Sequence, residues 1–446
     1  MTTPGSPGLA DCEDVAWFRD RLDAARGAAA ALGRRIGLGD QRTAELVLAV
    51  SELAANITKH AVDGSLLLRV LRSHAESAGN VVAGVEVIAV DSGPGMADVS
   101  AALRDGMSTA GTLGIGLGAV QRLADTFDIH SQPGVGTVQL ARFWPRSAAP
   151  ATAGEPAVGG ITRPISGEQS CGDAWAARMD ARTTAPRGQA PTAPDQAAGA
   201  PPSWSDLTSP RPTAVSAADA GLRAGPWPGS GGRPASAHGG DRPASVHGGD
   251  RPAPVHGGGR PASVRGGARP APVRGAVPGP GEGLLVMSCD GLGHGPLAAL
   301  AAQAAVQAFR TGSGHTPEQV MEEVHRALRG TRGAAVAVAR LEPDGRVLFC
   351  GVGNITAVLL TRTTRTTLLS HPGIVGHQTH QLRTHEYRMP AQGALVMHSD
   401  GLSERWKGAD LAGMLHHPPA VIATGLLRLA ATRRDDASAV IAKAAQ

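Results

Sequence analysis

The sequence has few cysteines and no apolar run long enough to cross a bilayer. Four cysteines occur among 446 residues, and no pair has the CxxC spacing of zinc sites, so neither zinc nor a disulfide framework is predicted. Cys171 and Cys289 lie beside acidic motifs, but thiolates are poor ligands for hard cations, and we interpret both as small buried side chains. The N-terminal segment also lacks the basic and then apolar pattern of a signal peptide. We therefore expect a cytoplasmic protein without a membrane-spanning segment.

Lysine is absent from the most basic part of the chain. Residues 182–275 contain 11 Arg, no Lys and 5 Asp, so this stretch carries +6 while the whole chain carries +4, which leaves −2 for the remainder. The repeats in this stretch also lack the Phe, Tyr and Trp side chains that stack on nucleobases. A nucleic-acid-binding or scaffold function based on the repeats is therefore disfavoured.

Glycine and proline are concentrated in one region, from about residue 183 to 281. It includes five tandem nine-residue units, which begin at Arg233, Arg242, Arg251, Arg260 and Arg269. Almost no large apolar residue is available there to offset the entropy of ordering the chain. A nine-residue period also occurs in Ca²⁺-binding β-rolls, but those need aspartates at fixed positions, and only two units carry Asp. The region is predicted to be a disordered insertion.

Periodic apolar residues outside this region predict two α/β units. In the N-terminal unit we expect helices over residues 14–35, 40–60 and 119–125, and strands over 66–71, 81–90, 127–131 and 137–143. In the C-terminal unit we expect strands over 284–288, 334–340, 347–351, 357–360, 394–399 and 437–442, and helices over 296–309, 317–328, 411–415 and 420–431. The predicted domains are residues 1–147 and 148–446, with the insertion inside the second.

The N-terminal unit contains three polar or glycine-rich motifs. Glu52 and Asn56 are four residues apart, so both side chains project from one face of a helix. Asp91-Ser-Gly-Pro-Gly95 follows a strand, and taken alone it predicts only a turn. Gly114-Ile-Gly116-Leu-Gly118 opens a helix, where free backbone N–H groups favour a phosphate, but its spacing is not that of a Rossmann fold.

The order of these motifs, followed by Gly134-Val-Gly136-Thr137, resembles the GHKL ATP-binding fold of bacterial sensor kinases and anti-sigma-factor kinases. Ser51-Glu-Leu-Ala-Ala-Asn56 and the segment 105–114 look most like the RsbT-type serine kinases, and the resemblance covers about residues 12–146. A sensor histidine kinase is not expected, because no phosphate-accepting His follows dimerisation helices.

The resemblance implies a role for each motif residue. Asn56 would ligate Mg²⁺ on ATP, and Glu52 would act as a base or orient the attacking hydroxyl. Asp91 would accept a hydrogen bond from the adenine amino group, and Thr137 would support the adenine. The glycines would allow close approach of backbone and water or close over the phosphates; they are Gly93, Gly95, Gly114, Gly116 and Gly118.

Four acidic motifs mark the C-terminal unit, each beside a strand-like run. They are Gly172-Asp173, Cys289-Asp290-Gly291, Ser399-Asp400-Gly401 and Arg434-Asp435-Asp436. Any single Asp-Gly pair predicts a turn. Together the four motifs supply enough carboxylates for two hard divalent cations, which activate water to hydrolyse phosphate esters.

In order, these motifs resemble the metal-dependent protein phosphatases of type 2C, and most closely the SpoIIE-like branch with RsbX and RsbU. The resemblance implies an α-β-β-α sandwich and a site for two Mn²⁺ or Mg²⁺ ions, with Asp173, Asp290, Gly291 through its carbonyl, Asp400 and Asp435 as ligands. Two questions stay open: whether Asp435 or its neighbour Asp436 is the ligand, with Asp435 favoured, and whether His294 is a general acid or binds backbone.

Two further features of this resemblance concern the fold around the motifs. Gly353 and Asn354 are interpreted as structural residues. The family joins its first two acidic motifs by a short hairpin, whereas here the insertion separates them, which puts the strand after Ala174 in doubt. Because loop-closure entropy grows slowly with length, an insertion of this size is tolerable.

The combined prediction is a bifunctional regulator. It pairs a metal-dependent serine/threonine protein phosphatase with a kinase-like domain that binds ATP and Mg²⁺. The expected partners are STAS-type anti-sigma-factor antagonists in their phosphorylated form, or related anti-sigma regulators of a stress response. The alternative is a phosphatase whose N-terminal domain only binds ATP or a partner protein.

Overall fold

The computed structural model describes residues 10–74, 81–104, 116–147, 157–180, 283–377, 381–432 and 434–443. All of them belong to one compact unit, and a second unit, residues 210–269, lies outside the described residues. The predicted insertion and its nine-residue repeats also lie outside them. Across the described ranges, no helix combines the length and the apolar character needed to cross a bilayer.

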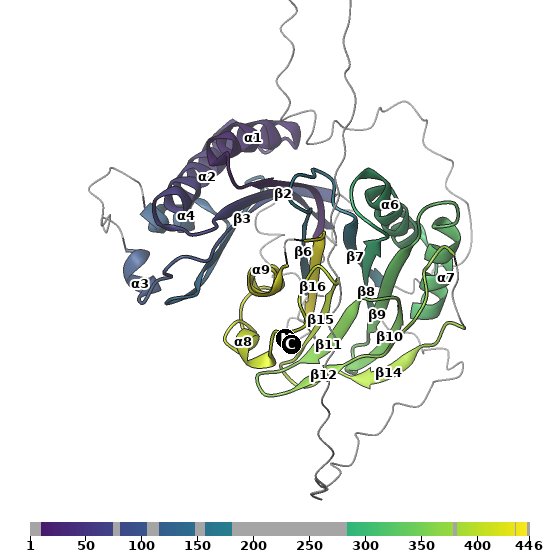
Figure 1. The fold of residues 1–446 in the computed structure, drawn as a ribbon. Coiled ribbons are helices and arrows are strands. Elements are labelled where there is room, and N and C mark those ends of the chain that lie inside the picture. The colour runs from purple at the N-terminus through teal and green to yellow at the C-terminus, as the bar shows by residue number, and fades with distance from the viewer. Residues whose placement is uncertain are drawn as a thin grey trace, which may run out of the picture. The chain divides into compact units, whose positions relative to one another are not determined.

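The N-terminal part is an antiparallel sheet with helices on one face (Figure 1). Its strands are β1 (Ala10–Phe18), β2 (Ser65–His74), β3 (Val81–Asp91), β4 (Thr126–Gln132) and β5 (Gly136–Phe143), in the order β1-β2-β3-β5-β4. The helices are α1 (Leu22–Arg35), α2 (Asp40–His60), the short α3 (Val99–Ala102) and α4 (Gly116–Leu123). Apolar side chains of α1, α2 and α4 share a buried core with one face of the sheet, and the predicted α/β sandwich is confirmed.

The first predicted helix was wrong over residues 14–21, because residues 14–18 belong to strand β1 and the helix begins only after them. Trp17 and Phe18 pair with Leu67 and Leu66 on β2, and helix α1 begins only at Leu22. A few apolar residues at this point fit either a helix or a strand, so the pairing with β2 decides the outcome.

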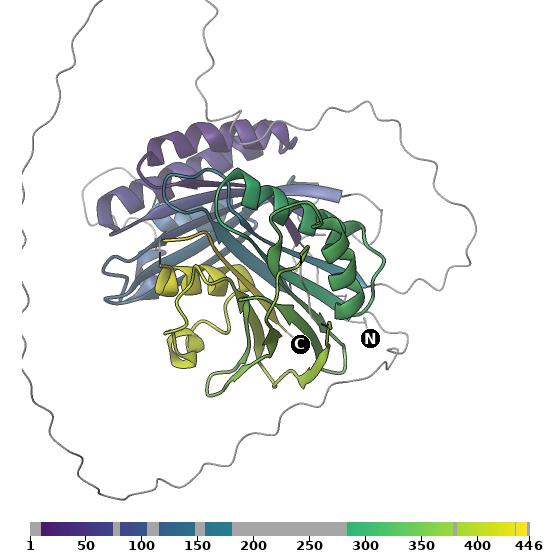
Figure 2. The same ribbon diagram turned by 45° about the vertical axis from the view of Figure 1, so that its right-hand side comes forward.

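The C-terminal part is a sandwich of two sheets (Figure 2). One sheet has the order β13-β10-β9-β8-β7, with β14 also paired to β10, and the other has the order β12-β11-β15-β16-β6. The strands are β6 (Val158–Arg163), β7 (Asp173–Asp180), β8 (Gly283–Gly291), β9 (Ala334–Leu341), β10 (Arg346–Val352), β11 (Thr356–Leu360), β12 (Arg365–Thr367), β13 (Ser370–His371), β14 (His385–Arg388), β15 (Ala394–His398) and β16 (Ala437–Lys443).

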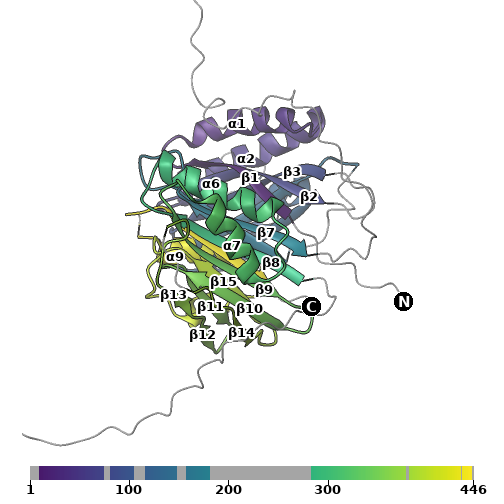
Figure 3. The same cartoon turned by 90° about the vertical axis from the view of Figure 1, so that its right-hand side faces the viewer.

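Helices cover both outer faces of this sandwich. They are α6 (Pro296–Thr311), α7 (Pro317–Ala327), α8 (Gly408–Ala412) and α9 (Pro419–Ala430). Helices α6 and α7 lie over the sheet of β7 to β10 (Figure 3) and share a buried core with it, and α9 packs on the other sheet. A third core, with Val286, Phe349 and Met397, fills the space between the sheets. These layers confirm the α-β-β-α sandwich.

The second face of the N-terminal sheet packs against the sandwich. Leu67, Ile88 and Leu140 lie in the same buried cluster as Ile422 and Leu426 of α9. Trp17 Nε1 also donates a hydrogen bond to the carbonyl of Thr162 on β6 at 2.8 Å. Helix α9 is therefore covered by a sheet on each side, which explains why its apolar residues are not confined to one stripe.

The same face carries a buried row of charges. Arg69, Glu86 and Arg142 pair in register across β2, β3 and β5, and both guanidinium groups bind the Glu86 carboxylate. Arg69 Nη1 also donates to the Gly160 carbonyl of β6 at 2.5 Å. Burial raises the pKa of Glu86, but the two arginines outweigh burial and lower it overall. Glu86 is therefore held as a charged link in this contact.

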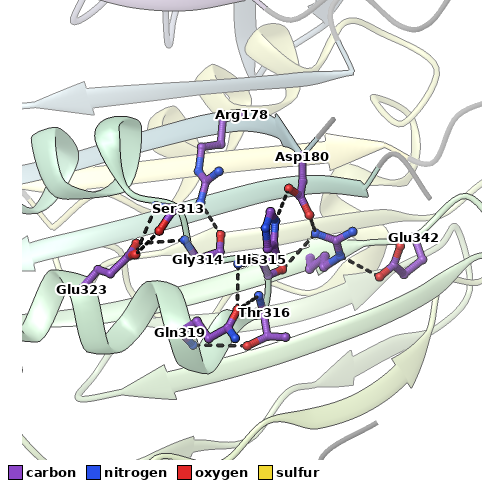
Figure 4. A network of polar contacts seen from close by, with 10 residues as sticks. Arg178, Asp180, Ser313, Gly314, His315, Thr316, Gln319, Glu323 and Glu342 are labelled. Carbon is purple, nitrogen blue, oxygen red and sulfur yellow. Dashed lines mark hydrogen bonds and ion pairs between the residues drawn. The ribbon is translucent and has the colours of Figure 1, made fainter. Parts of the chain in front are cut away.

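The strand after Ala174 is formed despite the long connection that follows it. Strands β7 and β8 pair along their whole length, from Asp173 opposite Asp290 to Asp180 opposite Gly283. At the far end, Arg340 binds the carboxylates of Asp180 and Glu342 in a network that includes His315 (Figure 4). A side chain at position 283 would meet the Arg340 guanidinium at 2.5 Å, so this pairing needs glycine. The network joins the end of β7 at Asp180 to Arg340 on β9, across Gly283 of β8.

Candidate active sites

The first and second acidic motifs meet at one end of the β7–β8 pair. Asp173 is the first residue of β7, and it is paired directly with Asp290 near the end of β8. The Gly291 N–H donates to the Gly172 carbonyl at 2.9 Å, which fixes the two motifs against each other. Cys289, directly before Asp290, is fully buried, as predicted for a small core residue, whereas Cys171 is only partly buried.

Burial and mutual repulsion change the pKa values of these carboxylates. Burial raises the pKa of Asp173, and the charges on Asp436 and Asp400 raise it further. Burial also raises the pKa of Asp290, helped by Asp173, Asp400 and Asp435. The pKa of Asp400 is raised in the same way, by burial first and by Asp435 second. A cluster of like charges in a poorly solvated place is stabilised by cations.

Asp400 lies in the turn that follows strand β15, where an asparagine binds it. Asn354 Nδ2, in the turn after β10, donates to Asp400 Oδ2 at 2.5 Å. Asn354 was interpreted from the sequence as structural, and the fold instead gives it a direct contact with a site carboxylate. Its signal in the sequence was the Gly353-Asn354 pair directly after a buried strand, where Gly353 has φ +94°.

The two neighbouring carboxylates of the last motif have different surroundings. Asp436 is 3% exposed, and its carboxylate accepts hydrogen bonds from the N–H groups of Ile165 at 2.7 Å and Gly172 at 2.6 Å. It therefore holds the loop that leads into Asp173. Asp435 is half-buried, and its charge acts on Asp290 and Asp400.

The donor set of this cluster matches the chemistry of hard divalent cations. All the side-chain donors are carboxylate oxygens, which Mg²⁺ and Mn²⁺ prefer. Asp173 Oδ2 is buried and has no hydrogen-bond partner in the described part of the chain. Among the described residues, however, no three His, Cys, Asp or Glu side chains are gathered closely enough to hold a metal ion as they stand. The chemistry fits, and binding would have to draw the carboxylates closer together.

His294 lies on the loop between β8 and α6. Its side chain is 60% exposed, and Nδ1 lies 3.7 Å from Glu168 Oε1. The charge of His294 also lowers the pKa of Asp436, against the larger effect of burial. The histidine is thus beside the acidic cluster and open to solvent, and Glu168, which was not among the predicted site residues, is its neighbour.

In the N-terminal part, the predicted nucleotide residues lie on α2, at and just after the end of strand β3, on β5 and at the start of α4. Glu52 and Asn56 are both half-buried on α2. Asp91 Oδ1 accepts a hydrogen bond from the Gly93 N–H at 2.7 Å, and a Cβ on Gly93 would meet that oxygen at 2.9 Å. Gly95 has φ +66°, and a Cβ there would lie 2.1 Å from the Gln132 carbonyl oxygen. Both glycines are thus required by close backbone approach.

Thr137 and two of the three phosphate-loop glycines can also be located. Thr137 is paired with Asp91 across β3 and β5, and its Oγ1 lies 2.9 Å from Ser131 Oγ. Gly116 opens α4 with φ +76°, and Gly118 is buried within that helix, so the helix begins three residues earlier than predicted. Gly114 lies outside the described residues.

Comparison with known proteins gives matches for both parts of the chain. Residues 19–142 match the histidine kinase-like ATPase domain, and residues 280–444 match stage II sporulation protein E (SpoIIE). The serine/threonine-protein kinase RsbT of Bacillus subtilis (strain 168) is 37% identical over 123 residues, which are 27% of this chain and 88% of that kinase. This chain belongs to the RsbT-like ATPase family and carries a SpoIIE-type phosphatase domain.

Solved structures also resemble this RsbT-like, SpoIIE-type chain. One, from work on the bacterial stressosome, is 21% identical, covers 64% of this chain and 98% of its own, and has a TM-score of 0.39. RsbX in complex with magnesium is 21% identical, covers 36% of this chain and 80% of its own, and has a TM-score of 0.32. With TM-scores this low, neither structure adds to the identification. The sequence matches to RsbT and to SpoIIE support a regulator of the partner-switching kind.

Proposed function

We propose that the SpoIIE-type domain is a metal-dependent protein phosphatase that releases phosphate from phosphoserine and phosphothreonine of a partner protein. The observation that carries this proposal is the direct pairing of Asp173 with Asp290. Asp400 and Asp435 lie close enough for their charges to raise the pKa of Asp290. Asp173, Asp290, Asp400, Asp435 and the Gly291 carbonyl would hold two Mn²⁺ or Mg²⁺ ions. When bound, such ions lower the pKa of a water and neutralise charge on phosphoryl oxygens.

The residues around the cluster have supporting roles in this proposal. Asn354 orients Asp400 through its hydrogen bond, and Asp436 fixes the loop before Asp173 through two backbone bonds. We assign Asp435 as the ligand rather than Asp436, because both Asp436 oxygens accept backbone N–H groups, whereas Asp435 accepts the Asp436 N–H on Oδ1 alone. His294 is exposed beside the cluster and is assigned as the group that protonates the leaving serine oxygen.

The RsbT-like domain is proposed to bind ATP with Mg²⁺ and to transfer phosphate to a protein of the same pathway. Asn56 would hold the Mg²⁺, Glu52 would orient the attacking hydroxyl, and Asp91 with Thr137 would bind the adenine. The 37% identity to a serine/threonine-protein kinase supports this assignment. The proposed partners are phosphorylated anti-sigma-factor antagonists of the STAS type in the cytoplasm.

A second candidate for this domain is ATP or partner binding without phosphate transfer. It is supported by the packing of helix α9 on the sheet, since α9 contacts the nucleotide end of that sheet. Incubation of full-length Asp290→Asn, in which the proposed phosphatase centre cannot remove the label, with γ-labelled ATP and a purified STAS-type protein separates the two. Label on the added protein, lost in a Glu52→Gln variant that still binds ATP, supports the kinase; nucleotide binding without label would leave the binding role.

A further inference from the structure

An arginine of the phosphatase domain reaches the nucleotide end of the RsbT-like sheet. Arg428, in the last turn of α9, donates from Nη1 to the Val135 carbonyl at 2.9 Å. Val135 lies in the tight turn between β4 and β5. A Cβ on the next residue, Gly136, would lie 2.7 Å from the same Nη1 and 2.1 Å from the Asp91 carbonyl oxygen. The glycine thus leaves room for the arginine beside the end of β3.

Arg428 is also an electrostatic neighbour of the Asp91 carboxylate. Burial raises the pKa of Asp91, while the Gly93 N–H and the Arg428 charge lower it. A cavity of about 320 Å³ lies between the two elements, lined by Asp91 and Ser92 on one side and by Thr424, Leu427 and Arg428 on the other. The Arg428 guanidinium therefore favours the charged form of Asp91, the carboxylate that is assigned to bind adenine.

The C-terminal end of helix α9 leads to the acidic cluster of the phosphatase domain. Directly after α9, Ala431 pairs with Leu402, and the Thr432 N–H donates to the Gly401 carbonyl at 2.9 Å. Ser403 N–H donates to the Ala430 carbonyl at 2.8 Å. Gly401 follows Asp400 directly. Six residues thus separate Arg428 from Asp435 in the chain, and the Asp400 turn is bonded to Ala430 and Thr432 within that stretch.

We propose that Arg428 is a positioning residue of the nucleotide site, and that helix α9 couples nucleotide binding to the phosphatase centre. The inference rests on the proposed function of both domains. An adenine over Asp91 excludes water, and an attraction between charges grows stronger as water is excluded. Nucleotide binding then favours the state in which Arg428 is hydrogen-bonded to the Val135 carbonyl over the state in which this bond is broken. The bond in turn fixes the last turn of α9, which leads into Thr432. By linkage, a ligand whose affinity for the phosphatase centre is changed by nucleotide changes the nucleotide affinity by the same factor.

The test measures hydrolysis of p-nitrophenyl phosphate by the full chain, a small substrate that needs no partner protein. Rates are compared with and without a non-hydrolysable ATP analogue at fixed free Mn²⁺, and inorganic triphosphate controls for chelation. The quantity compared is the ratio of the two rates, taken separately for each variant. For the unaltered chain we expect a change of about fivefold or more, the lower end of measured couplings.

In Arg428→Met the ratio should be close to one, and nucleotide binding measured by calorimetry should be several-fold weaker. Arg428→Lys should restore part of both effects, and it shows that loss in Arg428→Met is not loss of folding. Arg388→Met, at an exposed arginine on β14, is the matched control and should keep the full ratio. A ratio of one in the unaltered chain, or an unchanged ratio in Arg428→Met, would overturn the inference.

Failure of the proposed function would give a different result. If the unaltered chain binds the analogue but hydrolyses nothing, the phosphatase assignment fails and the inference fails with it. If it hydrolyses the substrate but binds no nucleotide, the ATP assignment fails, again with the inference. Hydrolysis and binding that are both present but independent overturn the coupling alone.

Discussion

Asp173 and Asp290 lie directly opposite each other on β7 and β8, although more than a hundred residues separate them in the chain. The pairing places the first two acidic motifs of the phosphatase domain at one end of a continuous antiparallel pair. The Arg340 network closes the opposite end, at Asp180 and Gly283. The first two acidic motifs are therefore brought together despite the long connection between β7 and β8.

The contact between Asn354 and Asp400 gives a prediction about metal affinity. Removing a partner that orients a metal-binding carboxylate typically weakens binding or activity by about 10- to 100-fold. Asn354→Ala should therefore raise the Mn²⁺ concentration for half-maximal phosphatase activity by about that factor, as measured by metal titration. Gln303→Ala, at an exposed position of α6, is the control. An unchanged titration in Asn354→Ala would show that Asn354 has only a structural role.

The charge row between the RsbT-like sheet and β6 predicts a large loss of stability. Glu86→Gln leaves Arg69 and Arg142 buried without their shared carboxylate. Removing one partner of a buried ion pair costs about 3–5 kcal/mol. Denaturant unfolding should show this loss, while Glu322→Gln, at an exposed position on α7, should have little effect. Equal stability of the two variants would mean that the charged row does not stabilise the packing of the RsbT-like sheet on β6.

The histidine pair between the two domains predicts a response to acid. His130 Nδ1 lies 3.2 Å from His417 Nε2, and His417 Nδ1 lies 2.7 Å from Asp128 Oδ2. Burial, then the charges of His417, Arg428 and His416, lower the pKa of His130 to about 4, and Asp128 opposes them. The folded chain therefore binds fewer protons here than the unfolded chain, whose His titrates at about 6.5. Stability should rise with pH between these values and fall as pH decreases.

The measurement is the thermal midpoint from pH 4 to pH 7. His130→Gln should make the fall of the thermal midpoint at low pH smaller than in the unaltered chain, because it removes the titrating group. His60→Gln, at an exposed histidine of α2, should leave the curve unchanged. Parallel curves for His130→Gln and the unaltered chain would contradict the assignment of the response to His130.

The sequence predicted most elements because their apolar patterns are long and regular. Helix α2 and strands β2, β3, β8 and β9 were all found, and the α-β-β-α sandwich was implied by the family resemblance that the acidic motifs carry. Strand β6 and the short strands β12 to β14 were not predicted. Their sequences are short or rich in Gly, Thr and His, and neighbouring strands rather than local pattern place them in a sheet.

Contacts between distant segments account for the parts of the sites that were missed. Asn354 and Asp400 are 46 positions apart, and the loop near Gly172 reaches Asp436 across 264. Neither spacing is periodic, so local patterns carry no signal for either contact. The same holds for Arg428 and Val135, which lie in different domains. At these positions the sequence shows which type of side chain is present, but it does not show which residue that side chain contacts.

The central claim is that the paired aspartates and their neighbours form the phosphatase centre. The most direct measurement is Mn²⁺-dependent release of phosphate from a phosphoserine protein by the unaltered chain, Asp290→Asn and Asp400→Asn. Asp344→Asn, in the exposed turn between β9 and β10, is the control. We predict that release is lost in both site variants and kept in the control. Full Mn²⁺-dependent release by Asp290→Asn would contradict the account.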